Sequence, residues 1–254
     1  MKYATSEKNS PIAILSALAE EQYGLIELLQ SPSKVTHAGR DFWLGDLHGQ
    51  SVVLALSKIG KVAAATTTTA LIERFGVQRI VFTGVAGGLG KGINVGDVVV
   101  GQSFVQHDLD SSPLFPRYEV PLYGKTRFDG DAGLTALLYA AARAAMANPR
   151  LCGAYPAAKA HLGLVASGDR FVSGAHESST LRDALLLAGH DVLAVEMECA
   201  AVAQVCHDYG VPFAAVRTIS DRADDTAHVD FPSFADQVAS RYAQVIVAQF
   251  LGTL

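Results

Sequence analysis

The chain has 254 residues, half of them hydrophobic and 18% charged, with a net charge of −5. This composition supports a large buried core, and an acidic balance without a basic block argues against nucleic acid as a partner. No uncharged apolar run reaches about 18 residues, so we predict no transmembrane segment; residues 1–10 lack the apolar core of a secretory signal, and we expect a flexible extension there.

Short apolar runs alternate with longer amphipathic segments, which predicts an α/β fold with a parallel or mixed sheet. The strands are expected at residues 11–17, 42–47, 51–57, 79–83, 95–100, 161–167, 192–195 and 211–219. The helices are expected at residues 19–29, 62–75, 131–147, 180–188, 197–208 and 234–250. Because the sequence shows no repeat, linker or low-complexity tract, we expect residues 11–254 to form one domain.

Two acids begin the first expected helix, close to the carboxyl edge of the sheet. Glu20 and Glu21 lie in its first turn, where the helix dipole favours negative charge. They are either simple N-terminal charges, or one of them points into the cleft where open α/β sheets bind ligands. The pattern leaves both interpretations open.

The small side chains at 63–69 predict a close helix–helix contact, either within the chain or across a dimer.

Further along, residues 84–92 are rich in glycine and follow the strand expected at 79–83. We expect a loop whose backbone N–H groups approach a ligand, although a tight turn has the same composition. The loop is not a Walker phosphate loop, because Val85 and Gly92 occupy positions that require glycine and Ser or Thr.

Residues 106–129 contain three prolines and no hydrophobic period. A loop of this length inside a compact domain is often a lid or an interface arm. Phe171 follows the strand expected at 161–167, and it is either a core plug or an aromatic platform for a flat ring.

Three cysteines, Cys152, Cys199 and Cys206, suit a reducing cytoplasm better than a disulfide scaffold. Cys199 and Cys206 lie seven residues apart on one expected helix face, and we interpret them as buried structural thiols. Since no Cys-x-x-Cys or His-x-x-x-His spacing indicates a metal site, we predict neither a metal nor a cofactor.

The apolar runs at 192–206 and 211–219 carry the most informative acids. The first run contains Glu196 and Glu198, and Asp221 follows the second. An ionised carboxylate in apolar surroundings is costly unless it is paired, hydrogen-bonded or used in chemistry. We therefore expect these acids to serve a function.

Glu21, the glycine loop, Phe171, Glu198 and Asp221 all lie at ends of expected strands, and such ends converge on one edge of an α/β sheet. Together these groups suit cleavage of a bond between a sugar and a base. One acid protonates the leaving group, another activates water, and a third holds the sugar hydroxyls and faces the developing oxocarbenium charge.

Seven short motifs occur in a characteristic order. They are Ser-Ala-Leu-Ala-Glu-Glu at 16–21, Ser-Lys-Ile-Gly-Lys-Val-Ala-Ala-Ala at 57–65, Thr-Gly-Val-Ala-Gly-Gly at 83–88, Val-Gly-Asp at 95–97, Ser-Gly-Asp-Arg-Phe at 167–171, Val-Glu-Met-Glu at 195–198, and Val-Arg-Thr-Ile-Ser-Asp at 216–221. From Ile12 to Phe250 the sequence resembles the bacterial 5′-methylthioadenosine/S-adenosylhomocysteine nucleosidases of the nucleoside phosphorylase superfamily.

The resemblance implies catalytic roles for four residues. Glu21 matches the general base that holds the attacking water with help from Arg217, and Asp221 matches the general acid that protonates N7 of adenine, with Ser220 orienting it. Glu198 matches the residue that grips the ribose hydroxyls.

The resemblance also implies the remaining substrate contacts. Met197 would pack against the sugar, Phe171 would stack on adenine, and the backbone of Val172 would read the base edge. The apolar pocket for the 5′-alkylthio group would comprise Leu18, Ile59 and Phe231. The glycine loop would contact the substrate through Val85, Ala86 and Gly87.

The fold implied by the resemblance is a three-layer α/β/α sandwich around a mixed, partly closed sheet. The implied assembly is a homodimer in which a partner loop, here 111–122, completes the 5′ pocket. Two positions depart from the family. Val85 stands where some members have a serine that helps to bind the water, and Arg170 stands where a small residue is common.

Three alternatives remain in view. A phosphorylase of the same fold needs several cationic or N–H donors for phosphate; near the first strand end and the glycine loop the sequence has Glu20 and Glu21 but no arginine, so we favour water as the nucleophile. A futalosine-type nucleoside hydrolase would differ only in the 5′ pocket. A nucleoside-binding protein without catalysis is disfavoured by the three acids.

Overall fold

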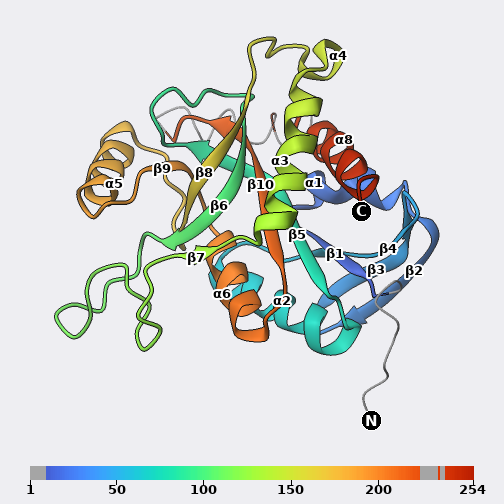
Figure 1. Cartoon of the computed structure of the whole chain (residues 1–254), viewed down its shortest axis with the longest axis horizontal. Helices are drawn as coiled ribbons and strands as arrows, with labels where there is room; N and C mark the ends of the chain where they lie inside the picture. Colours follow the sequence, from blue (N-terminus) through green and yellow to red (C-terminus); the bar gives the residue numbers. More distant parts are fainter. Residues whose placement is uncertain (1–9, 224–233, 235–237) are drawn as a thin grey trace.

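A computed structural model of the chain describes residues 10–223, 234 and 238–254 (Figure 1). Apart from Ser10, the N-terminal extension expected at 1–10 lies outside the described residues. The strands are β1 (Ile12–Ser16), β2 (Gln30–His37), β3 (Arg40–Leu47), β4 (Gln50–Leu56), β5 (Arg79–Gly88), β6 (Val98–Gln106), β7 (Phe128–Asp129), β8 (Ala160–Ser167), β9 (Val192–Glu196) and β10 (Phe213–Asp221). The helices are α1 (Ala19–Ile26), α2 (Lys61–Phe75), α3 (Ala132–Met146), α4 (Pro149–Cys152), α5 (Ala175–Leu187), α6 (Cys199–Tyr209) and α8 (Ser240–Leu251).

All the described strands belong to one mixed sheet in the order β10-β6-β8-β9-β5-β1-β4-β3-β2, with β7 paired to β6. Strand β10 also pairs with β5, which closes β10, β6, β8, β9 and β5 into a ring. The β2–β3–β4 meander extends the sheet beyond this ring through β1. The expected mixed, partly closed sheet is therefore confirmed.

Helices cover both faces of the sheet (Figure 1). Alternate residues of β1 point to opposite faces: Ala13 and Leu15 join one core cluster with α2 and α6, whereas Ile12 and Ile14 join another with α1, α3 and α8. This period of two produces the expected three-layer α/β/α sandwich. Helix α2 packs against α6 of the same chain, so a helix–helix contact within the molecule is confirmed, and a contact of α2 across a dimer stays a prediction.

Strand β2 was not predicted from the sequence, and its composition explains why. It is largely exposed, contains Pro32, and lacks the alternating apolar pattern of a half-buried strand. It pairs only with β3 at the end of the sheet order, and an edge strand tolerates proline because one side of its backbone needs no partner strand.

The glycine-rich segment corrects a second prediction. Instead of forming a loop from residue 84, β5 continues to Gly88, because its backbone pairs in parallel with β10 as far as Gly87 and with the end of β9. Helix α5 also begins earlier than expected, at Ala175, and α6 begins later, at Cys199 with Glu198 as its N-cap. The expected start of the last helix falls partly outside the described residues.

Between β6 and β7 the chain is irregular, as expected, and residues 107–127 extend away from the body of the molecule (Figure 1). We call these residues the arm. Within the described parts of the chain, no helix is both long and apolar enough to cross a membrane.

Candidate active site

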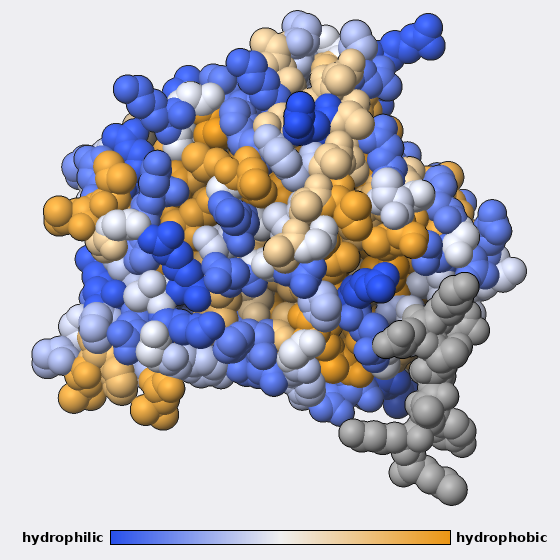
Figure 2. Space-filling model, in the orientation of Figure 1, coloured by the Kyte–Doolittle hydropathy of each residue, from blue (hydrophilic) through white to orange (hydrophobic). Residues whose placement is uncertain are grey.

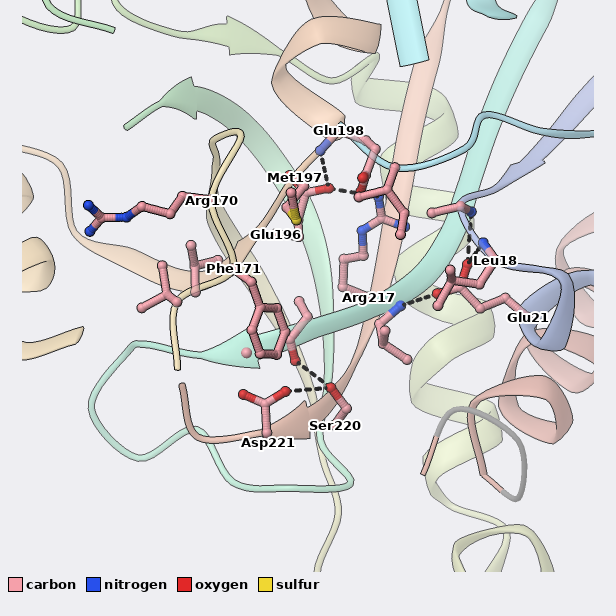
Figure 3. A pocket seen from close by; sticks show the side chains of 17 residues that line it. Leu18, Glu21, Arg170, Phe171, Glu196, Met197, Glu198, Arg217, Ser220 and Asp221 are labelled. Carbon is pink, nitrogen blue, oxygen red and sulfur yellow. Dashed lines mark hydrogen bonds and ion pairs between the residues drawn. The ribbon is translucent and has the colours of Figure 1, made fainter. Parts of the chain in front are cut away.

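A cavity of about 350 Å³ lies where β1, β5, β9 and β10 end and the segment after β8 begins (Figure 3). Strand β9 is antiparallel to β5 but pairs with it only near its C-terminal end, through Ala194 and Val195, so the C-terminal ends of both strands meet there. Of the fourteen residues predicted to form the site, thirteen line this cavity, and Phe231 lies outside the described residues. The others that line it are Ala17, Arg170, Val195 and Glu196.

Glu21 is the buried acid of the first helical turn, with 2% of its surface exposed, whereas Glu20 is exposed. Its Oε2 accepts hydrogen bonds from the N–H groups of Ala17 (2.8 Å) and Leu18 (2.9 Å), and its Oε1 accepts one from Val85 (3.1 Å). Burial raises the pKa of Glu21 above its ordinary value, although the charge of Arg217 and the three N–H groups oppose the shift. Glu21 therefore points into the cleft with an increased affinity for a proton.

Arg217 lies on β10 directly opposite Gly84 of β5 and is almost completely buried. Its Nη2 donates to Glu196 Oε2 at 2.8 Å and lies 3.7 Å from Glu198 Oε2, while the guanidinium stacks 4.0 Å from the ring centre of Phe82. Among the described residues, Nε and Nη1 of Arg217 have no hydrogen-bond partner. The side chain thus contacts both Glu196 and Glu198, while its Nε and Nη1 donors at the cavity wall make no hydrogen bond to the described residues.

Glu196 is the principal partner of Arg217, and the sequence motif contained it without indicating a role. It accepts a short hydrogen bond from Ser167 Oγ and others from the N–H groups of Glu198 (3.0 Å) and Cys199 (3.0 and 3.1 Å). Burial favours its neutral form, but Arg217 and these donors outweigh that effect and lower the pKa of Glu196. Glu196 is therefore the acid that stays ionised beside Arg217.

Glu198 has the opposite electrostatic character. Its Oε1 accepts a hydrogen bond from the N–H of Gly60 at 2.8 Å. Burial, followed by the negative charge of Glu196, raises the pKa of Glu198 to about 8, against the opposing effects of Arg217 and Gly60. Near neutral pH Glu198 holds a proton, which it can donate to a hydroxyl oxygen of a ligand.

This raised pKa predicts how stability depends on pH. A carboxyl group that binds its proton more tightly in the folded state stabilises the protein at low pH, and this stabilisation is lost as pH rises from the unfolded value of 4.5 through about 8. We expect Glu198→Gln, which cannot ionise, to melt close to the wild type at pH 5 and several degrees above it at pH 9. Calorimetric melting across this range checks the expectation, and parallel curves for the two proteins would contradict it.

At the other end of the cavity, Asp221 and Ser220 lie beside Phe171 (Figure 3). Ser220 Oγ donates to Asp221 Oδ2 at 2.8 Å, and the N–H of Ala223 donates to Asp221 Oδ1 at 2.8 Å. Only 3% of the surface of Asp221 is exposed. The carboxyl group is thus held in a fixed orientation at the cavity wall.

The glycines of β5 leave room for these side chains. A Cβ atom on Gly84 would lie 2.4 Å from Arg217 Nη1 and 3.0 Å from Glu21 Oε1, and a Cβ atom on Gly87 would lie 3.0 Å from Asp221 Oδ1. Glycine is therefore required here by the close approach of functional side chains to a paired strand, and not by a phosphate-binding loop.

Phe171 and Ile59 stand at the cavity mouth, 44% and 56% exposed, so Phe171 is not a core plug. The guanidinium of Arg170 points away from the cavity and forms a close ion pair with Glu177 of α5 (Figure 3). Arg170 therefore does not bring its positive charge into the cavity beside Phe171 and Val172.

No cysteine side chain lines the cavity. Cys152, Cys199 and Cys206 are all buried and unpaired, which confirms the interpretation of the latter two as buried thiols. In the parts of the chain that the structure describes, no group of three or more His, Cys, Asp or Glu side chains is placed to hold a metal ion.

Comparison with known proteins adds an independent line of evidence. A family model described as the phosphorylase superfamily matches residues 11–251. The 5′-methylthioadenosine/S-adenosylhomocysteine nucleosidase of Bacillus thuringiensis (strain Al Hakam) is 37% identical over 236 residues, which are 93% of this chain and 96% of the relative.

Two solved structures are similar over nearly their whole length. The 5′-methylthioadenosine/S-adenosylhomocysteine nucleosidase from Neisseria meningitidis, in complex with methylthio-immucillin-A, is 35% identical with a TM-score of 0.85, and the match covers 96% of this chain and 100% of that one. The futalosine hydrolase of Helicobacter pylori is 33% identical with a TM-score of 0.84, over 98% of this chain and 100% of that one.

Proposed function

Since this chain belongs to the phosphorylase superfamily, we propose that it is a purine nucleosidase that hydrolyses the N-glycosidic bond of 5′-methylthioadenosine, S-adenosylhomocysteine or both, releasing adenine. The observation that carries the proposal is the meeting of Glu21, Glu198 and Asp221 around a single cavity. Relatives named for this activity support it, because their similarity extends over nearly the whole chain.

The geometry supports a division of labour among the acids. Asp221, oriented by Ser220, donates a proton to N7 of the adenine leaving group as the glycosidic bond breaks. Glu21, whose pKa burial raises, accepts the proton of the attacking water. Glu198 binds the ribose hydroxyls and faces the sugar as its oxocarbenium charge develops.

The site disfavours phosphate as the nucleophile, although one part of the sequence argument was wrong. Arg217 does lie beside the β5 glycines, because β10 pairs with β5 and places it opposite Gly84. Its charge is nevertheless paired with the ionised carboxylate of Glu196 at 2.8 Å, and the carboxyl groups of Glu198, at 3.7 Å, and Glu21 lie close by. A phosphate dianion would find the positive charge of Arg217 already paired with Glu196, whereas water needs no cationic partner.

Incubation of the protein with 5′-methylthioadenosine, with and without phosphate, tests the proposal. We expect adenine to be released at equal rates in both mixtures, together with the free thioribose sugar. A strict phosphate requirement with a ribose 1-phosphate product would show a phosphorylase, and adenine binding without turnover would show a binding protein.

A futalosine-type nucleoside is the second candidate substrate, because a futalosine hydrolase is as similar in structure as the nucleosidases. The described part of the 5′ wall, formed by Leu18 and Ile59, is apolar and suits an alkylthio group, which has little to hydrogen-bond. Comparing kcat/KM for 5′-methylthioadenosine, S-adenosylhomocysteine, 5′-deoxyadenosine and futalosine separates the candidates.

We also propose a homodimer in which residues 111–122 of the partner's arm complete the 5′ pocket. Leu114 and Leu122 of the arm are 84% and 91% exposed, and Figure 2 shows hydrophobic surface at the lower left, where the arm lies. Such exposed apolar side chains favour an interface. Sedimentation velocity tests the assembly.

Methionine salvage in a reducing cytoplasm is the setting that fits both the proposed substrates and the three unpaired thiols.

A further inference from the structure

Two walls of the cavity come from segments more than 100 residues apart in the sequence. Residues 58–61, at the start of α2, carry Ile59, and residues 168–172, after β8, carry Phe171. Val172 anchors the second wall in the core, but Phe171 and Ile59 are themselves about half exposed, so core packing of these two side chains does not set the distance between them. A cluster of charged side chains outside the cavity joins them instead.

Three residues form a closed set of hydrogen bonds. Asp169 Oδ1 accepts from the backbone N–H of Lys61 at 2.7 Å, and the backbone N–H of Asp169 donates to Asp108 Oδ2 at 2.8 Å. Asp108 Oδ1 in turn accepts from Lys61 Nζ at 2.6 Å. Each residue is bonded to the other two, and we call Lys61, Asp108 and Asp169 the pocket staple.

Each bond of the staple crosses between different elements. Lys61 begins α2, Asp108 follows β6, and Asp169 follows β8. Since Lys61 is the first residue of α2, the bond from its N–H to Asp169 places a carboxylate at the positive end of the helix dipole. Because Asp108 accepts through both of its carboxylate oxygens, it connects the side chain of Lys61 to the backbone of residues 168–172 at Asp169.

The electrostatics of Asp108 agree with this geometry. Its burial acts to raise its pKa, but the hydrogen bond and charge of Lys61 and the N–H of Asp169 outweigh burial and lower it. Asp108 therefore stays ionised, as an acceptor in charge-assisted hydrogen bonds must. Lys61 Nζ makes a further hydrogen bond to Gln106 Oε1 at 3.0 Å, which connects the staple to the end of β6.

The staple also reaches the acid that faces the sugar. Gly60, next to Lys61, donates its N–H to Glu198 Oε1 at 2.8 Å. Gly60 has a φ of 96°, and a Cβ atom there would lie 3.0 Å from Asp169 Oδ1. Asp169 thus lies directly against the backbone that orients Glu198.

From these contacts we infer that Lys61, Asp108 and Asp169 are positioning residues, which set the spacing of Phe171, Ile59 and Glu198 before the nucleoside binds. The inference rests on the proposed function, because it assigns these three contacts to one nucleoside. A ligand binds more tightly when the wall it touches is already held in place, since less freedom is lost on binding. Adenine touches the wall at Phe171, and the whole nucleoside touches both walls, so the affinity for each depends on the staple. None of the three staple residues lines the cavity, so they act through the walls they join.

The test compares Asp169→Ala with Asp169→Asn, which keeps an oxygen acceptor for the N–H of Lys61. We expect Asp169→Ala to raise both KM for 5′-methylthioadenosine and Kd for adenine by about tenfold or more, with kcat changed by less than about threefold. Asp169→Asn should restore both constants to near wild-type values. Lys61→Met should shift them in the same direction as Asp169→Ala, and it carries the test if Asp169→Ala does not fold.

Asp131→Ala is the matched control. Asp131 also accepts a hydrogen bond at the start of a helix, from the N–H of Leu134 at 2.8 Å, but it lies away from the cavity. We expect Asp131→Ala to lower Tm without changing KM or the affinity for adenine. Unchanged constants in Asp169→Ala and Lys61→Met, equal damage in Asp169→Asn and Asp169→Ala, or an equal rise in KM in Asp131→Ala would each overturn the inference.

Adenine affinity separates this inference from the proposed function. If the wild-type protein binds adenine but releases none from 5′-methylthioadenosine, the nucleosidase proposal fails, whereas the effect of the staple on Kd can still be measured by calorimetry. If the wild type turns over and the staple variants bind adenine as the wild type does, the inference fails and the nucleosidase proposal stands.

Discussion

Replacing Asp221 with asparagine is expected to lower kcat by about 10²–10⁴-fold, the usual contribution of a general acid. Asparagine has almost the same shape and keeps an oxygen that can accept from Ser220 or from the N–H of Ala223, as the carboxylate does. It has no acidic proton for N7 of the leaving adenine. The substitution therefore removes the chemistry while leaving the cavity wall largely intact.

Three measurements check this prediction. Steady-state kinetics with 5′-methylthioadenosine give kcat and KM, calorimetry gives the Kd for adenine, and melting shows whether the fold is retained. We expect the affinity for adenine to stay measurable, and Asp183→Asn, on the exposed surface of α5, to behave as the wild type in all three. Near-normal turnover in Asp221→Asn would exclude Asp221 as the acid.

A single methyl group at Gly84 is expected to lower kcat/KM by about 10²-fold or more, because a displacement of about 1 Å at a catalytic centre has effects of this size. In Gly84→Ala the new Cβ atom would lie 2.4 Å from Arg217 Nη1 and 3.0 Å from Glu21 Oε1. Neither side chain can yield easily, since both are buried, Arg217 is paired with Glu196, and Glu21 is held by three backbone N–H groups. The substitution would therefore move both groups at once.

Gly252→Ala provides the comparison for this substitution. Gly252 follows α8 with a φ of −68°, and the nearest atom to an added Cβ is the carbonyl oxygen of Ala248 at an ordinary 3.4 Å. We expect this variant to keep wild-type kcat/KM and Tm. If Gly84→Ala had wild-type activity as well, the space between Glu21 and Arg217 would not be needed by either group.

Most of the fold followed from local pattern. Strands that are buried on both faces, such as β1 and the first half of β5, have continuous apolar runs, so the sequence alone predicts them. Strand β2 escaped prediction because an exposed edge strand needs no apolar period, and its pairing with β3 is visible only in the folded sheet. The continuation of β5 through Gly84–Gly88 escaped it because glycine is a poor strand former unless neighbouring side chains need its space.

The site shows the same division. Glu198 and Asp221 were recognisable because a carboxylate in or beside an apolar run has to be paired or used. Local pattern did not separate Glu20 from Glu21; only the family resemblance selected Glu21, and the structure buries Glu21 and exposes Glu20. Glu196 was visible as a buried acid, but its pairing with Arg217 depends on β9 and β10 ending at the same cavity.

By itself, the amino-acid sequence determined which segments are buried, which acids must be satisfied or used, and which family the motifs resemble. These properties depend on side chains within a few residues of one another, or on their order along the chain. Only the tertiary structure decided that Arg217 faces Gly84, that it engages Glu196 and Glu198, and that Asp169 joins the two cavity walls. The physical reason is that a buried charge takes its ionisation state from neighbours a few ångströms away, and those neighbours meet only when the ring of strands closes.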